Sequence, residues 1–98
     1  NARLYLNTAD QSTASISGFI LTPNPFRSEP RLQNLTGKKM EVRIDMLSGT
    51  GQVIQTLFHT FEPGKSIPLA MLDKASRGLC LLRISSQEGQ MILKGIKL

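Results

Sequence analysis

The 98-residue chain has one cysteine, one histidine and no tryptophan. A single cysteine, Cys80, excludes a disulfide within the chain, and together with His59 it cannot supply the three or four nitrogen and sulfur ligands of a zinc site. No apolar run is longer than that of Leu79–Leu82, which is far shorter than the roughly 20 residues that a membrane-spanning helix needs. Disulfide-stapled folds, zinc sites and membrane-spanning helices are therefore not predicted.

Groups suited to catalysis are equally scarce. His59 is the single histidine and so the one candidate for a general base, and its neighbours Phe58 and Phe61 favour a packing or surface role. Cys80 lies in an apolar stretch, where a thiol usually behaves as a small core residue. The seven acidic residues are spread over separate segments and are interpreted as solvated charges. The sequence therefore predicts no enzyme and no cofactor.

The charge balance is basic, with a net charge of +5 and a pI near 9.9. Such a balance raises the question of a nucleic-acid partner. However, the basic residues are scattered, with Lys38-Lys39 as the one adjacent pair, and aromatic residues are not interleaved with them. We therefore expect no nucleic-acid binding.

Alternating apolar and polar residues between turn signals predict β-strands. In Met40–Met46 the even-numbered residues are apolar, so they should face a core while Glu41, Arg43 and Asp45 face solvent. Gly49 and Gly51 follow and are each able to take a positive φ, which predicts a hairpin turn. Glu62-Pro63-Gly64-Lys65 has the residues of a type II turn.

The other segments complete an all-β pattern. We expect Gln52–Phe61 to be a strand covered on both faces, and Leu79–Ile84 to be a central strand, also covered on both faces. The further expected strands are a short edge strand around Pro68, a last strand over Met91–Leu98 whose Ile92, Ile96 and Leu98 share one face, and weaker candidates at Leu4–Asn7, Ile16–Thr22 and Arg31–Leu35. Ala70–Ser76 is expected to be a loop. Asn34-Leu35-Thr36 fits the glycosylation pattern, which often arises by chance.

Seven or eight short strands without a long helix predict an immunoglobulin-like antiparallel β-sandwich, with a small barrel as the alternative. The domain is expected over residues 19–98. Residues 1–18, in which Ala9–Ser15 is polar and loop-like, are expected to be a linker or the end of a preceding region with a possible first strand.

Four motifs in a fixed order support a more specific interpretation. They are Pro23-Asn24-Pro25, the strand Val42–Ile44 leading to Gly49, the segment Gly78–Ile84, and Lys94-Gly95-Ile96-Lys97-Leu98. Together they resemble the type A C-terminal sorting domain of proteins exported by the type IX secretion system of Bacteroidota. Cys80 stands where that family usually has tyrosine, Met46 stands where an aspartate commonly precedes the turn, and Thr50-Gly51 resembles a two-residue insertion.

This resemblance implies a non-catalytic export address on an N-terminal cargo domain. The implied partners are the outer-membrane translocon and a sortase-like protease that cuts upstream of the domain, with possible surface anchoring of the cargo. The implied location is the periplasm in transit to the outer membrane, the cell surface or the medium. The expected contact residues are Lys94, Gly95, Ile96, Lys97 and Leu98, with Pro23, Asn24 and Pro25 shaping the start of the domain, and Gly49, Gly78 and Cys80 belonging to the remaining motifs.

Other readings of the sequence stay open. A cell-surface adhesive or carbohydrate-binding sandwich would need an exposed aromatic platform, although aromatic residues make up only 5% of the chain. A generic sandwich module would have no address at all. In each case an exposed edge strand is able to add to a neighbouring sheet, which leaves open self-association of the domain.

Overall fold

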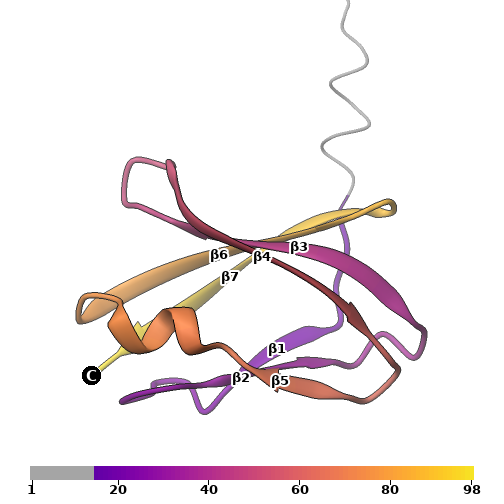
Figure 1. Cartoon of the computed structure of the whole chain (residues 1–98), viewed down its shortest axis with the longest axis horizontal. Coiled ribbons are helices and arrows are strands. Elements are labelled where there is room, and N and C mark those ends of the chain that lie inside the picture. The colour runs from indigo at the N-terminus through magenta and orange to yellow at the C-terminus, as the bar shows by residue number, and fades with distance from the viewer. Residues whose placement is uncertain (1–14) are drawn as a thin grey trace, which may run out of the picture.

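The computed structural model describes residues 15–98, so the strand expected at Leu4–Asn7 lies outside the described residues. Seven strands form two antiparallel sheets, which Figure 1 shows as two layers. One sheet has the order β1-β2-β5, with β1 at Phe19–Thr22, β2 at Arg31–Asn34 and β5 at Ser66–Pro68. The other has the order β4-β3-β6-β7, with β3 at Met40–Leu47, β4 at Val53–Phe61, β6 at Gly78–Ser86 and β7 at Gly89–Lys97. The predicted all-β sandwich is confirmed.

The core lies between the two layers. Phe19 of β1 and Phe61 of β4 meet there edge to face, with ring centroids 5.4 Å apart. The alternating residues of β3 face this core as predicted: Met40, Val42, Ile44 and Met46 are all buried. Ser15 and Ile16 are attached to β7, because Ser15 forms a parallel bridge with Gln90 and the Ile16 amide donates to the Gln90 carbonyl at 3.1 Å.

Three predictions about burial are wrong. Asp45 is only 1% exposed, because its carboxylate is covered by Arg43 of its own strand and by side chains from both neighbouring strands. β4 is not covered on both faces: it is an edge strand, and Phe58 remains 73% exposed. β6 has the central position that was predicted, but only its inner face is covered, since Leu79 on the outer face is 61% exposed.

Local geometry differs from prediction at two places. Ala70–Lys74 forms a short 3-10 helix, η1, where a loop was expected, because Met71 and Leu72 turn inward and are buried at one end of the sandwich. In the β3–β4 turn only Gly51 takes a positive φ, of 87°, so the prediction for Gly49 is wrong. The type II turn is confirmed, with Gly64 at φ 78° and the Lys65 amide bonded to the Glu62 carbonyl at 3.2 Å.

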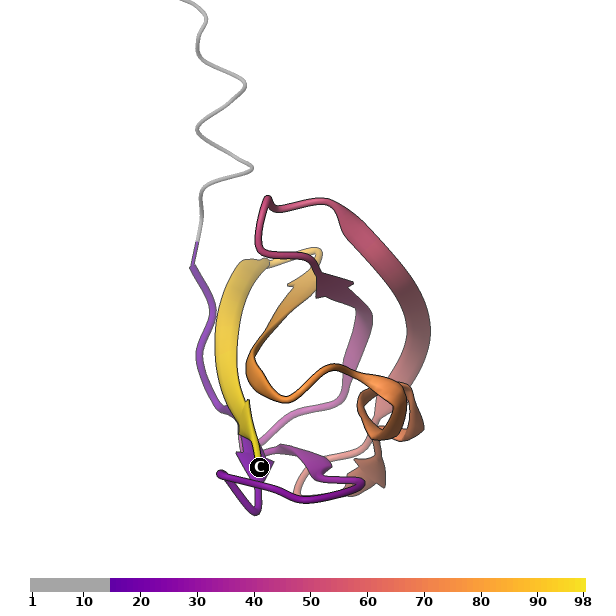
Figure 2. The same cartoon turned by 90° about the vertical axis from the view of Figure 1, so that its left-hand side faces the viewer.

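Figure 2 shows the end of the sandwich at which both η1 and the C-terminus lie. No helix within residues 15–98 has the length and apolar character needed to cross a membrane.

Candidate functional site: the C-terminal strand and the Pro-Asn-Pro segment

The candidate site is the outer edge of β7, along which the chain segment that follows β1 is laid. Phe26 donates its amide hydrogen to the Ile96 carbonyl at 2.8 Å, and its own carbonyl accepts from the Leu98 amide at 2.8 Å. These bonds form a parallel bridge between Phe26 and Lys97. The structure therefore brings the Pro-Asn-Pro motif and the C-terminal motif, far apart in sequence, to one strand edge.

Asn24 completes this attachment through its side chain. Its amide nitrogen donates to the Lys94 carbonyl at 2.9 Å, and its amide oxygen accepts from the Ile96 amide at 3.0 Å. The flanking Pro23 and Pro25 have no amide hydrogen to offer, and both peptide bonds that precede them are cis. A carboxamide carries the same donor and acceptor as a peptide group, so Asn24 acts on the β7 edge as a backbone residue of an added strand would.

Gly95 is buried on the inner face of β7, at a position that has no room for a side chain. A Cβ atom at this position would lie 2.9 Å from a methyl carbon of Leu21 and 3.2 Å from the ring of Phe26. Cys80, its partner on β6, is 6% exposed and belongs to the core, as predicted. Burial raises the pKa of the Cys80 thiol against the opposing charge of Lys97, so the thiol stays protonated near neutral pH.

The two lysines of the C-terminal motif have different surroundings. The ammonium group of Lys97 turns toward η1 and donates to the carbonyl oxygens of Leu72 at 3.1 Å, of Ala75 at 2.9 Å, and of Asp73. Lys94 instead lies on the outer face of the sheet and is exposed. Lys97 therefore belongs to the internal structure of the domain, whereas Lys94 is free to meet a partner.

The remaining predicted residues surround this edge or lie further away. Ile96 and Leu98 are 41% and 50% exposed beside Lys94. Gly78, with φ 106°, begins β6 opposite Lys97. Gly49 is in the β3–β4 turn and forms no part of the β7 edge.

Sequence reasoning missed a charged cluster on the outer face of the four-stranded sheet. The Asp45 carboxylate accepts hydrogen bonds from Arg83 at 3.0 and 3.2 Å, from Arg43 at 3.1 Å and from the Thr56 hydroxyl at 2.7 Å. Burial is the strongest single influence and raises the pKa of Asp45, but the bonds from Thr56 and Arg83 and the two positive charges outweigh it and hold the pKa below its ordinary value. Asp45 and Arg83 are 38 residues apart and meet only through the β3–β6 register, so no local sequence pattern predicted the cluster.

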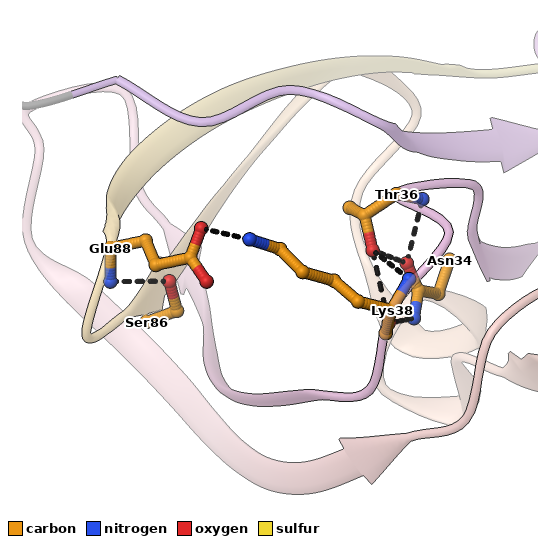
Figure 3. Close-up of polar contacts among 5 residues, drawn as sticks. All are labelled: Asn34, Thr36, Lys38, Ser86 and Glu88. Carbon is orange, nitrogen blue, oxygen red and sulfur yellow. Dashed lines mark hydrogen bonds and ion pairs between the residues drawn. The ribbon is translucent and has the colours of Figure 1, made fainter.

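The glycosylation pattern has a structural role instead. Asn34 is completely buried; its oxygen accepts from the Thr36 amide at 2.9 Å and hydroxyl at 2.6 Å, and its nitrogen donates to the Lys38 carbonyl at 2.8 Å (Figure 3). The Lys38 ammonium lies 2.7 Å from a Glu88 oxygen, an ion pair that ties this loop to the β6–β7 turn and is drawn in Figure 3. In the folded domain the Asn34 amide is not accessible to a glycosyltransferase.

The described residues give little support to a metal site or to a carbohydrate-binding surface. Within residues 15–98, no group of three or more His, Cys, Asp and Glu side chains is placed to hold a metal ion. Phe58 is the only strongly exposed aromatic side chain in this part of the chain, since Phe19, Phe26 and Phe61 are buried. A stacking platform for sugars needs more than one such ring.

Comparison with known proteins adds no family to these observations: no family model matches the chain, and no curated protein is significantly similar to it.

Proposed function

We propose that this domain is a non-catalytic export address that directs an N-terminal cargo through the outer-membrane translocon of the type IX secretion system. The observation that supports it best is the joining of Asn24 and Phe26 to the β7 edge. Two of the four motifs behind the family resemblance are about seventy residues apart, yet they form one hydrogen-bonded unit. Because loose similarity in two unrelated segments would not require them to meet, this contact favours a single recognition element.

Within this unit the residues divide into two roles. Gly95 and Lys97 build the element, the first through close packing and the second through its bonds to η1. Lys94, Ile96 and Leu98 face outward, and we propose that they contact the translocon. A sortase-like protease would then cut upstream of the folded domain, because a protease needs an extended backbone that paired strands do not offer.

The test is export of a reporter protein fused ahead of residue 1 in a bacterium with a type IX system. The variant Lys94→Ala/Ile96→Ser/Leu98→Ser removes the outward side chains and keeps the backbone bonds to Asn24 and Phe26. Its matched control is Lys39→Ala/Ile20→Ser/Leu35→Ser, which changes one exposed lysine and two exposed apolar residues away from β7. Both variants are first checked for an unchanged thermal transition.

We expect the β7 variant to hold the reporter in the periplasm, while the control variant delivers it to the surface or the medium. Equal export of the two variants would contradict the proposal. Failure of the unaltered domain to export the reporter at all would reject the sorting function itself.

A further inference from the structure

The outer face of β6 and β7 carries apolar side chains that no part of the described core requires. On β6 the alternate residues Cys80, Leu82 and Ile84 are buried, so the residues between them point outward. On β7 the buried Gly95 marks the inner face in the same way. The outward residues of the two strands form what we call the β6–β7 patch: Leu79, Leu81, Ile92, Lys94 and Ile96.

The strand register brings the residues of this patch side by side. Leu79 is paired with Ile96 and Leu81 with Lys94, and Ile92 follows on the same face of β7. Cross-strand partners on one face of a sheet are about 5 Å apart and their diagonal neighbours about 7–8 Å, so the patch is continuous. Contiguous exposed apolar side chains are typical of a surface that a partner covers.

β6 itself indicates that its outer face is meant to be covered. Its first half, Leu79–Leu82, is apolar on both faces, which is typical of a strand buried on both faces. Only the inner face is buried within the domain, since Leu79 is 61% exposed on the outer one. The sequence pattern and the burial of β6 would agree if a partner were bound on this face.

Lys94 is the one charged residue of the patch. No ion pair within residues 15–98 includes Lys94, and the charge of Arg83, which is paired with Ile92 beside the patch, is already matched by Asp45. Burying an ammonium group without an opposite charge is unfavourable. The patch is therefore complementary to an apolar surface that contains a carboxylate.

This chemistry favours a protein as the occupant. Attraction to an anionic membrane surface depends on a cluster of basic residues, and the patch has a single lysine. A second copy of the chain would carry the same net charge of +5, which opposes association through a patch that has a lysine and no acidic residue. The translocon fits better, because Lys94 and Ile96 already belong to the contact proposed above.

We propose that the contact with the translocon extends from the C-terminal motif over the whole β6–β7 patch. Leu79 and Ile92 then bind an apolar surface of the translocon, and Lys94 pairs with an acidic side chain on it. This inference rests on the proposed function, which supplies the partner. It adds contact residues outside the C-terminal motif and states the chemical character of the surface that they meet.

The test uses the same reporter fusion with the variant Leu79→Thr/Ile92→Thr, which leaves the C-terminal motif unchanged. Threonine removes apolar surface and retains a high preference for strands. The matched control is Ile54→Thr/Phe58→Thr on β4, where the two side chains are 59% and 73% exposed, at least as much as those of Leu79 and Ile92. Both variants are checked for an unchanged thermal transition.

We expect the amount of exported reporter to fall about tenfold or more for Leu79→Thr/Ile92→Thr and to stay near that of the unaltered domain for the control. Equal export of these two variants would overturn the extended contact. If the Lys94→Ala/Ile96→Ser/Leu98→Ser variant were retained at the same time, the sorting function would stand and only the extension would fall. Failure of the unaltered domain to export the reporter would reject both proposals.

The charge of the partner surface has its own test, which also decides the proposal if the threonine variant fails to fold. Lys94→Glu should reduce export more than Lys94→Gln does, because it sets two carboxylates against one another. The control Lys65→Glu makes the same change of net charge at an exposed residue away from the patch and should export normally. Equal export of Lys94→Glu and Lys94→Gln would contradict an acidic partner.

The other occupants are distinguished with the purified chain. Cosedimentation with vesicles of equal parts phosphatidylethanolamine and phosphatidylglycerol, lost in Leu79→Thr/Ile92→Thr, would make the membrane the occupant and overturn the protein contact. A dimer in sedimentation equilibrium that the same variant abolishes would overturn it in favour of a second copy. We expect neither association.

Discussion

At the scale of single residues, Asp45 is the strongest departure from a simple exposed sheet face. Its carboxylate is on the outer side of β3, yet Arg43, Arg83 and Thr56 cover it almost completely. A buried carboxylate is tolerated only when its oxygens accept hydrogen bonds, and here three neighbouring side chains donate them. The cluster therefore links β3 to β6 by an ion pair and β3 to β4 by a hydrogen bond, on the face opposite the core.

Replacing Asp45→Asn should destabilise the domain by about 1–3 kcal/mol at neutral pH, less than for a fully buried ion pair because Arg43 stays half exposed. Urea unfolding measures the loss, and Asp73→Asn, which changes an exposed acid, should cost little. Because the pKa of Asp45 is lowered on folding, its ionised form stabilises the domain above about pH 4, and this contribution is lost as the pH falls through the folded pKa. The difference between the unaltered chain and Asp45→Asn should therefore shrink in acid. A difference that persists unchanged at low pH would refute the role assigned to the carboxylate.

At the scale of elements, β7 and η1 depend on one another. η1 is a single short 3-10 helix, and the ammonium group of Lys97 donates hydrogen bonds to carbonyl groups at its C-terminal end. Lys97 of β7 thus serves as a C-terminal cap for η1. Together with the burial of Met71 and Leu72, this contact explains why a segment expected to be a loop is regular in the folded chain.

Lys97→Met keeps most of the aliphatic stem and removes the ammonium group, so it should cost about 1–3 kcal/mol, the range for hydrogen bonds to a charged group, reduced by the partial exposure of the site. Lys94→Met on the same strand is the matched control and should leave stability nearly unchanged. Thermal unfolding gives the comparison, and faster hydrogen exchange at Ala75, whose amide bonds to the Leu72 carbonyl, would report loosening of η1. Similar stability losses in the two variants would show that the bonds to η1 are not what distinguishes these lysines.

Strands and turns with a clear local pattern were predictable from the sequence. The neighbours of each strand in the sheet were not. Alternation in Met40–Met46 and the turn residues Pro63-Gly64 were sufficient to place β3 and the turn after β4. The edge position of β4 depends on which strands pair, and no periodicity within Val53–Phe61 reports that. Likewise, the Pro-Asn-Pro motif was visible in the sequence, but the attachment of Asn24 to β7 depends on long-range register. Burial on outer faces and contacts between distant motifs are properties of the assembled sheets.

At the scale of the whole molecule, β7 connects the two layers of the sandwich. It is hydrogen-bonded to β6 in the four-stranded sheet, and the segment leaving β1 of the other sheet bonds to its outer edge. Its Gly95 packs against Leu21 of β1, and its Lys97 holds η1 at the end of the core. The last five residues therefore stabilise both sheets, whatever else they contact.

Removing residues 94–98 should consequently unfold or severely destabilise the domain. The deletion breaks the bonds of Asn24 and Phe26 to β7, uncovers Leu21 and leaves η1 without its cap. We expect loss of a cooperative thermal transition, or a large drop in its midpoint, measured by circular dichroism. By contrast, the Lys94→Ala/Ile96→Ser/Leu98→Ser variant, which keeps the backbone and the Lys97 contacts, should melt near the unaltered chain. If the shortened chain melted like the unaltered one, β7 would not be the link between the layers. If the shortened chain unfolds as expected, failed export after this deletion could result from loss of the fold or from loss of the export address. Only the side-chain variant, which stays folded, separates these two causes.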